Sequence, residues 1–230
     1  MSPLARRALA EFVGTAFLVS AVIGSGIAAA RLSPDDVGLQ LLENSLVTGA
    51  ALIALITALQ PVSAAFNPVV TLVERALGAV TSRDAGALVV SQLAGGFLGA
   101  VAANLMFDLD AVSISSHHRA TSAHLLGEVI ATLGLLVVIF GAARAGRGDR
   151  VAVTVGSYIT AAYWFTSSTS FANPAVTVAR MFSDTFAGIA PASVPAFVVA
   201  QLIGGLVGYV LIRALYPSQT TLPIAREATA

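Results

Sequence analysis

Two short motifs carry the side chains with the clearest chemical meaning in this chain. Asn67-Pro68-Val69 and Asn173-Pro174-Ala175 each follow a short run of small and polar residues. Proline is favoured in the first turn of a helix, and asparagine is a strong N-cap because its side-chain oxygen accepts a hydrogen bond from a free backbone N–H. Each motif therefore predicts the start of a helix, where amide donors and the positive end of the helix dipole come together.

The helices that these motifs start are too short to cross a bilayer. Their apolar stretches run from Val69 to Leu77 and from Ala175 to Phe182, whereas a spanning helix needs about 20 apolar residues. Interrupted hydrophobic segments at matching places in two halves of a chain point to a pore or binding site at the membrane midplane. We therefore expect two half-helices whose N-termini lie inside a membrane protein.

The composition is typical of a membrane protein with several spans. Of the 230 residues, 57% are hydrophobic and 10% are charged, and the mean hydropathy is +0.86. The first apolar segment is too long for a signal peptide and has no clear cleavage site, so we expect no cleaved leader. Six segments approach the length of a spanning helix: Leu9–Ala30, Leu39–Leu59, Ala85–Phe107, His124–Ala143, Val151–Phe165 and Val194–Leu215.

The basic residues predict the orientation of the chain. All 12 are arginine and the formal net charge is zero, so the charge gives no indication of nucleic-acid binding. In an arrangement with six spans, Arg31, Arg119 and Arg180 fall on one side of the membrane. The others fall on the opposite side: Arg6, Arg7, Arg75, Arg83, Arg144, Arg147, Arg150, Arg213 and Arg226. The positive-inside rule then predicts that both termini are cytoplasmic.

The two halves of the chain share further sequence besides the motifs. Residues 10–15 (AEFVGT) match residues 127–132 (GEVIAT), and residues 92–99 (QLAGGFLG) match residues 201–208 (QLIGGLVG). Each repeat has three spans, at about 7–107 and 123–215. An odd number of spans inverts the second copy, so we expect the half-helices to enter from opposite sides and meet end to end. Residues 1–230 then form one membrane domain, with a disordered cytoplasmic tail at 217–230.

On these motifs and matched halves, the chain resembles the aquaporin, or major intrinsic protein, superfamily from Arg7 to Leu215. The resemblance implies an all-α membrane protein with six tilted transmembrane helices and two re-entrant half-helices. It also implies a homotetramer with one pore in each subunit and no cofactor. Glu11 and Glu128 match the family's buried acidic residues, which brace the re-entrant loops.

The chain departs from the family pattern at both motifs. The first motif ends in Val69 instead of alanine. Water and glycerol channels of the family usually have arginine directly after the second motif, at the outer constriction, but Val176 stands there in this chain. The next arginine is Arg180, for which a salt bridge or a solvated side chain is favoured over the alternative of a role in the pore.

The other positions of the selectivity filter follow from the same resemblance. They are Thr48 from the second span, Ala162 from the fifth span and Phe171 from the second loop. Both loops before the motifs look one residue short, so Tyr163 and Ser170 are the alternatives to the last two. Together with Val176, these residues predict an uncharged and mainly apolar filter.

The predicted function is passive conduction of small neutral solutes. A solute at the midplane accepts hydrogen bonds from Asn67 and Asn173, which orients water and breaks a proton-conducting chain. Loss of the filter arginine widens the outer gate and favours larger solutes. The stretch from Ser170 to Arg180 resembles aquaporin-like channels of bacterial arsenic-resistance operons. That resemblance implies conduction of As(OH)3, related metalloid hydroxides, glycerol-like polyols and water across a plasma (inner) membrane.

Two other functions remain open from the sequence. One is a dedicated water channel, which Val176 argues against. The other is an ion-coupled secondary transporter, because such proteins also contain inverted repeats. A transporter needs titratable groups at the midplane, where the motifs offer only asparagine. The chain has no cysteine, catalytic triad, metal-ligand spacing or nucleotide-binding loop. We therefore expect neither an enzyme nor a metal site, and we expect the lipid bilayer and small solutes as partners.

Overall fold

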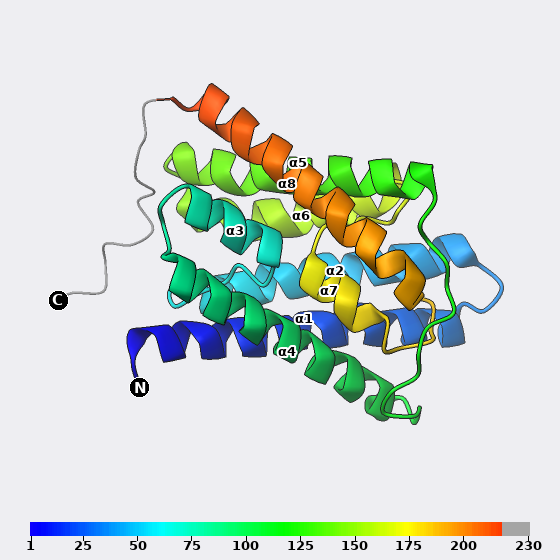
Figure 1. Ribbon diagram of the computed structural model, residues 1–230. Helices are drawn as coiled ribbons and strands as arrows, with labels where there is room; N and C mark the ends of the chain where they lie inside the picture. Colours follow the sequence, from blue (N-terminus) through cyan, green and yellow to red (C-terminus); the bar gives the residue numbers. More distant parts are fainter. Residues whose placement is uncertain (218–230) are drawn as a thin grey trace.

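The computed structural model describes residues 1–217, which fold into a bundle of helices (Figure 1). No strand occurs within these residues, which confirms the predicted all-α membrane fold. The elements are α1 (Pro3–Leu32), α2 (Val37–Leu59), α3 (Pro68–Ala76), α4 (Ser82–Met106), α5 (Ser122–Arg144), η1 (Gly148–Arg150), α6 (Val151–Phe165), α7 (Pro174–Arg180), η2 (Pro191–Ser193) and α8 (Val194–Leu215). Of the predicted tail at 217–230, all but Pro217 lies outside the described residues.

The six predicted spans correspond to α1, α2, α4, α5, α6 and α8. In the described part of the chain, five helical segments are long and apolar enough to cross a membrane, and the last of them joins η2 to α8. The exception is α6, which has 15 residues. Its rise of about 22 Å is shorter than a hydrocarbon core of about 30 Å. The 3-10 turn η1 directly precedes α6 and continues the helical path.

Most of the differences from the predicted bounds lie at capped helix ends. Helix α1 begins at Pro3, earlier than expected, because the Ser2 hydroxyl accepts a hydrogen bond from the Ala5 N–H at 3.2 Å. Proline at the first helical position fits this start. Helix α7 ends at Arg180 and not at Phe182. Hydropathy locates the apolar stretch of each helix, but side-chain caps decide where the helix begins.

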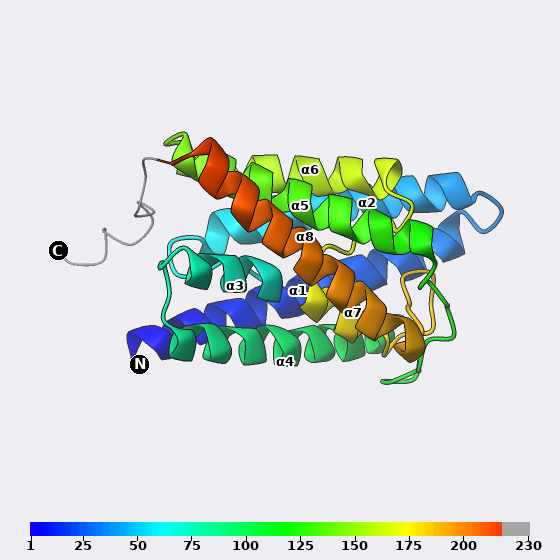
Figure 2. The same cartoon turned by 45° about the horizontal axis from the view of Figure 1, so that its top comes forward.

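The half-helices α3 and α7 lie in the middle of the bundle and run toward opposite ends of it (Figure 1). In the view of Figure 2 they remain enclosed by longer helices. Helix α3 contacts α4 and α8, and α7 contacts α1, α4 and α8. Each half-helix is thus held by long helices from both repeats.

The long helices pack in two equivalent close pairs, α1 with α4 and α5 with α8. Glycines make this approach possible. A Cβ added at Gly95 would lie 2.1 Å from the Phe12 carbonyl oxygen, and one added at Gly204 would lie 2.6 Å from that of Val129. Small residues at such contacts are typical of helix pairs in membranes. The matched glycine strings therefore allow close packing within the two helix pairs that enclose α3 and α7.

Candidate functional site

The two motif asparagines cap their own half-helices. The Asn67 Oδ1 accepts from the Val69 N–H at 3.0 Å. The Asn173 Oδ1 accepts from the N–H groups of Ala175 at 2.9 Å and Val176 at 3.3 Å. Both asparagines have extended backbone dihedrals, as an N-cap requires. Both half-helices therefore begin at the motif, with the positive ends of their dipoles at the centre of the protein.

The same two side chains also join the repeats to each other. The Asn67 Nδ2 donates to the Ala172 carbonyl at 2.7 Å, and the Asn173 Nδ2 donates to the Phe66 carbonyl at 2.7 Å. A carboxamide nitrogen carries two hydrogens. One N–H of each asparagine thus holds the opposite loop, and one remains for another acceptor.

The residue before each asparagine has a left-handed backbone. Phe66 has φ of 49° and Ala172 has φ of 47°. Such a conformation in a residue other than glycine costs on the order of 1–3 kcal/mol and persists only where its surroundings hold it. These two residues supply the carbonyls that accept from the opposite asparagine. Nothing in their residue types signals this geometry.

A buried glutamate holds each loop from behind. The Glu11 carboxylate accepts from the N–H groups of Ala65 at 2.9 Å and Phe66 at 2.7 Å. The Glu128 carboxylate accepts from those of Phe171 at 2.9 Å and Ala172 at 2.8 Å. Hydrogen bonds to a charged acceptor are stronger than neutral ones, and they offset the cost of burying the carboxylate.

Two glutamines complete this network, and sequence reasoning missed their role. The Gln92 Nε2 donates to Glu11 at 2.8 Å and to the Thr71 hydroxyl at 2.9 Å. The Gln201 Nε2 donates to Glu128 at 2.6 Å and to the Thr177 hydroxyl at 2.8 Å. Both glutamines open the repeated glycine-rich strings, and both threonines follow their motif asparagine by four positions. A search of the repeats for matched polar residues could have found them.

A pair of hydroxyl groups lies between two of the long helices. The hydroxyls of Thr48 and Tyr163 lie 3.1 Å apart and share a hydrogen bond between α2 and α6. Val176 belongs to the same buried hydrophobic cluster as Tyr163. The structure thus brings Thr48 to Tyr163, the alternative residue, while Ala162 is fully buried beside it.

The two candidate residues from the second loop take different positions. Phe171 packs edge-on against Phe197 with 5.2 Å between ring centroids, in a cluster with Ile189 and Val194. That cluster is separate from the one that holds Val176. The Ser170 Oγ is buried and has no hydrogen-bond partner within the described part of the chain.

Arg180 does not lie where the sequence predicted. Its side chain is only 3% exposed, and its guanidinium carbon lies 3.4 Å from the centroid of the Phe171 ring. Its Nε donates to the Ala187 carbonyl. Neither ion pair among residues 1–217 includes Arg180. The predicted salt bridge is therefore wrong for residues 1–217, where an aromatic face and a carbonyl take the place of the acid.

Comparison with known proteins decides the family. The model of the major intrinsic protein family matches residues 1–167 and 147–230. The chain belongs to this family. It is 47% identical over 227 residues to the aquaglyceroporin AqpS of Rhizobium meliloti, covering 98% of this chain and 96% of that protein. It is 31% identical over 170 residues to the aquaporin NIP1-2 of Arabidopsis thaliana, covering 68% of this chain and 56% of that protein.

A solved structure supports the same fold. The aquaglyceroporin from Plasmodium falciparum superposes with a TM-score of 0.69 at 20% identity, covering 94% of this chain and 96% of that one. At that identity the likeness shows the fold alone. Major intrinsic proteins are channels, which fits the expectation that the chain is no enzyme.

Two charged features lie in the loop between α4 and α5 and in the segment that follows α7. Arg119 donates from Nε to the Gly188 carbonyl at 2.8 Å and from Nη2 to that of Phe186 at 3.1 Å. Burial lowers the pKa of its guanidinium from the ordinary value. Hydrogen bonds from Ser116 lower the pKa of the Asp184 carboxyl, whose Oδ1 lies 3.8 Å from His117 Nε2 at the surface. No group of three or more possible metal ligands occurs in the described residues.

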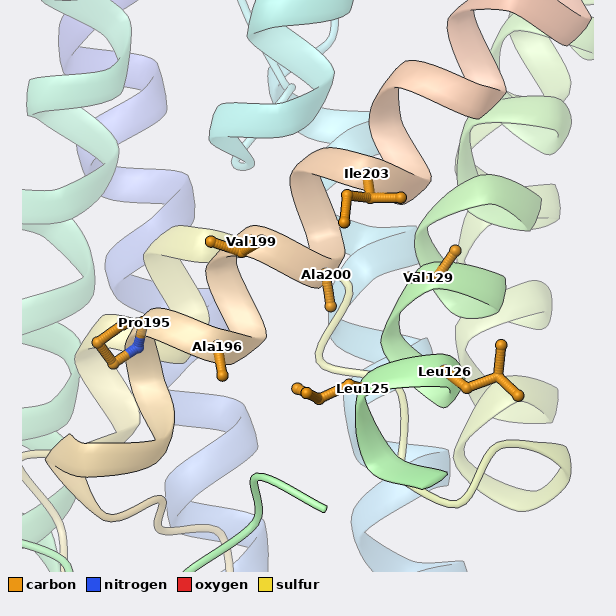
Figure 3. A pocket seen from close by; sticks show the side chains of 8 residues that line it. All are labelled: Leu125, Leu126, Val129, Pro195, Ala196, Val199, Ala200 and Ile203. Atoms are coloured by element: carbon orange, nitrogen blue, oxygen red, sulfur yellow. The ribbon is translucent and has the colours of Figure 1, made fainter. Parts of the chain in front are cut away.

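An apolar groove lies between α5 and α8, away from the motifs (Figure 3). Its volume is about 420 Å³. Eight residues line it: Leu125, Leu126, Val129, Pro195, Ala196, Val199, Ala200 and Ile203. None of them is a motif, brace or filter residue, so this groove is no part of the candidate pore.

Proposed function

We propose that this major intrinsic protein is a passive channel for small neutral solutes, among them glycerol-like polyols, As(OH)3 with related metalloid hydroxides, and water. The observation that carries the proposal is Val176. It is buried at the first turn of α7, where the family usually has arginine, in the same hydrophobic cluster as Tyr163. The name aquaglyceroporin, given to the relative that is 47% identical, supports the same class of solute.

At the midplane, the free N–H groups of Asn67 and Asn173 act as the selecting donors. Two half-helix dipoles, each equivalent to about half a positive charge, add to them at this point. A passing hydroxyl accepts from the asparagines and therefore points its own hydrogens outward. This order breaks a proton-conducting chain and disfavours cations.

At the outer constriction, we propose that Thr48, Tyr163 and Val176 form the filter. The two hydroxyls supply donors and acceptors on one wall, and valine supplies an apolar wall opposite. A polyol needs both, because it carries hydroxyls along one edge and carbon along the other. Phe171 supports this site from outside, and Ala162 and Ser170 lie behind it.

As(OH)3 suits the same path because it is a neutral molecule with three hydroxyls, as glycerol is. The resemblance of the stretch from Ser170 to Arg180 to the channels of bacterial arsenic-resistance operons supports this solute. Such a channel moves the solute down its gradient. It needs no cofactor, nucleotide or coupled ion.

We also propose a homotetramer in a plasma (inner) membrane, with both termini cytoplasmic and one pore in each subunit. The arginine distribution supports this orientation, since nine of the 12 basic residues fall at one end of the six-span arrangement. Labelling of single cysteines introduced at Ser2 and His118 on intact cells tests the orientation. The chain has no cysteine of its own to react.

Stopped-flow light scattering on proteoliposomes tests the function. We expect wild type to pass glycerol and As(OH)3. Val176→Arg should lose both by tenfold or more while water still passes, because arginine fills the gate. Val176→Ala is the matched control and should keep all three fluxes.

A dedicated water channel is the second candidate, and the hydrogen bond of 3.1 Å between Thr48 and Tyr163 favours it by narrowing the constriction. Fast water flux with no glycerol or As(OH)3 entry in wild type would establish that candidate and overturn the broader one.

A further inference from the structure

The arginine missing from its usual position has a counterpart one helical turn away. Arg180 follows Val176 by four residues, so the two side chains lie on the same face of α7. Side chains on a helix lean toward its N-terminus, which points Arg180 back toward the filter and the midplane. Val176 and Arg180 together therefore occupy the face that a single arginine serves in other members of the family.

The loop around the filter holds this guanidinium in place. Its carbon lies 3.4 Å from the centre of the Phe171 ring, and Phe171 precedes the second motif asparagine by two residues. The Nε donates to the Ala187 carbonyl. An aromatic face and a carbonyl stabilise a buried cation without neutralising it. The contacts thus fix the position of the charge and preserve it.

Arg180 forms no ion pair in the described part of the chain, although it interacts electrostatically with the buried carboxylate of Glu128, which accepts from the Phe171 N–H. The nearest charged group on another element packed against the same ring is a second cation. The Arg119 guanidinium carbon lies 5.5 Å from the centroid of Phe171, and its nitrogens donate to the carbonyls of Gly188 and Phe186. Two guanidinium groups thus lie against one ring.

A further observation concerns the exposure of the terminal nitrogens of Arg180. None of them donates a hydrogen bond within the described residues, and none is among the buried polar atoms that lack a partner there. They therefore keep some accessible surface, although the residue as a whole is 3% exposed. Next to Phe171 and above Val176, that surface lies at the outer end of the proposed pore.

We propose that Arg180, held over Phe171, supplies the fixed positive charge of the outer constriction and excludes cations although Val176 stands at the usual arginine position. The proposal rests on the proposed function, because it assumes that solutes pass this point. The arrangement separates two tasks. Charge selection stays with Arg180 at the rim, while Val176 leaves the filter wide enough for polyols.

The test measures cation leak and neutral flux in the same proteoliposomes. Alkali-cation and proton leak are followed with an imposed potential, and glycerol entry with light scattering. Arg180→Gln should raise the cation leak tenfold or more while glycerol still enters. Arg180→Lys keeps the charge and should stay within about threefold of wild type. The double variant Val176→Arg/Arg180→Gln should restore low leak.

Arg31→Gln is the matched control. Arg31 lies on the same predicted side, contacts the ring of Phe107 at 5.3 Å, and is no part of the filter, so its loss should not change the leak. If the cation leak of Arg180→Gln equals that of wild type while glycerol still enters, the proposed role of Arg180 is overturned. Absence of glycerol entry in wild type would instead overturn the proposed function.

If Arg180→Gln does not fold, the ion selectivity of the wild-type protein provides a second test. Any residual ion current through wild type should prefer anions over cations, because the charges at the rim are positive. A reversal potential that shows a preference for cations would overturn the proposal without any variant.

A separate observation concerns the other end of the bundle. A groove of about 580 Å³ lies between α5 and α6. Val137, Gly141 and Val153 are among its apolar lining residues, and Arg147 and Arg150 also line it. It lies at the end of the bundle where α1 begins and α5 ends (Figure 1). Both arginines are exposed, and no hydrogen bond or ion pair of their guanidinium groups occurs within residues 1–217.

The backbone between these arginines is anchored. The Gln60 Nε2 donates to the Gly148 carbonyl at 3.0 Å, which ties the loop to the end of α2. Asp149 lies between the two arginines and is also exposed. Two cations against one anion leave a net positive rim above an apolar groove. Basic pockets between transmembrane helices are suited to lipid headgroups.

We infer that this groove binds an anionic phospholipid, with the phosphate at Arg147 and Arg150 and an acyl chain along Val137, Gly141 and Val153. Native mass spectrometry of the full chain with phosphatidylglycerol or phosphatidylcholine tests this. Wild type should retain phosphatidylglycerol at least tenfold better. Arg147→Gln/Arg150→Gln should lose that preference, and Arg6→Gln/Arg83→Gln, at the same end but outside the groove, should keep it.

Equal retention of the two lipids by wild type would overturn the lipid site. So would a change in oligomeric state in Arg147→Gln/Arg150→Gln with lipid retention unchanged, since that result would assign the groove to a second copy of the chain.

Discussion

The midplane and the outer constriction of this channel are built on opposite principles. At the midplane every element occurs twice, with an asparagine, a glutamate, a glutamine and a threonine in each half. At the proposed constriction the halves match only in part: Val70 stands three residues after Asn67 as Val176 does after Asn173, but Glu74 holds in the first half the position of Arg180, which lies over Phe171. The hydroxyl of Thr48 meets that of Tyr163 there. The duplicated part is a scaffold that fixes the loops. We propose that the part in which the halves differ sets selectivity, because changing it leaves the scaffold bonds intact.

Loss of a loop brace should have the largest effect. Glu11→Leu and Glu128→Leu each leave two loop N–H groups without an acceptor. Each unsatisfied buried group costs about 1–3 kcal/mol, so we expect each variant to lose about 2–6 kcal/mol of stability. Thermal unfolding in detergent measures the loss. If the scaffold is symmetric, the two losses agree closely, and a loss in only one half contradicts it.

The close helix pairs give the next largest effect. Gly95→Ala and Gly204→Ala put a Cβ against a backbone oxygen of the neighbouring helix. Because backbone cannot move aside cheaply, each should cost about 1–3 kcal/mol, as overpacking does. Gly86→Ala is the control, since an added Cβ there meets no atom within 4 Å. A control variant that unfolds as early as the other two would contradict the packing account.

Tyr163→Phe tests whether the Tyr163 hydroxyl is part of the proposed filter. It removes the hydroxyl that meets Thr48. Loss of one hydrogen bond costs about 0.5–1.5 kcal/mol, or about two- to twelvefold in a rate or equilibrium that depends on it. We expect the ratio of glycerol to water permeability to change within this range, with little change in thermal stability. An unchanged ratio would remove Tyr163 from the filter.

Thr71→Val and Thr177→Val should have a smaller effect on stability. Each removes one acceptor of a buried glutamine N–H, although the carboxylate still accepts from the same nitrogen. We expect a loss of about 0.5–1.5 kcal/mol in each half and no change in solute selectivity. Thermal unfolding and stopped-flow flux on the same preparations check both parts.

Asp184→Asn should have the smallest effect. Hydrogen bonds from Ser116 lower the pKa of Asp184, so its stabilising contribution is present above the usual pKa of about 4 and is lost as the pH falls through the lowered value. The side chain is at the surface, so the contribution is small. Wild type and the variant should differ only above about pH 4. A difference that grows in acid would contradict this sign.

The sequence predicted the fold and much of the scaffold because both depend on repetition. Six apolar segments and two motifs define the all-α membrane fold, whereas the role of Glu11 and Glu128 as loop braces came from the family resemblance. Comparison of the repeats would have reached Gln92 and Gln201. In contrast, the left-handed backbone at Phe66 and Ala172 leaves no trace in their residue types.

The proposed constriction was harder to predict because the two halves differ there, as Glu74 and Arg180 do at matching positions. Because the position of a gap in the loop was uncertain, Ala162 and Tyr163 were both candidates for the filter position from α6. The hydrogen bond from Tyr163 to Thr48 is the observation that favours Tyr163. Arg180 was assigned to an acid or to water because Glu74, its counterpart in the first half, carries the opposite charge. A long side chain that turns back along its helix onto an aromatic ring cannot be read from spacing.

The most direct test of this division compares one change in each region. Val69→Ala gives the first motif the family's usual residue at the midplane, and Val176→Arg does the same at the constriction. The ratio of glycerol to water permeability is measured by stopped-flow light scattering in proteoliposomes. The account predicts that Val69→Ala leaves the ratio within about twofold of wild type and that Val176→Arg lowers it tenfold or more. A ratio that changes as much in Val69→Ala, or does not change in Val176→Arg, would contradict it.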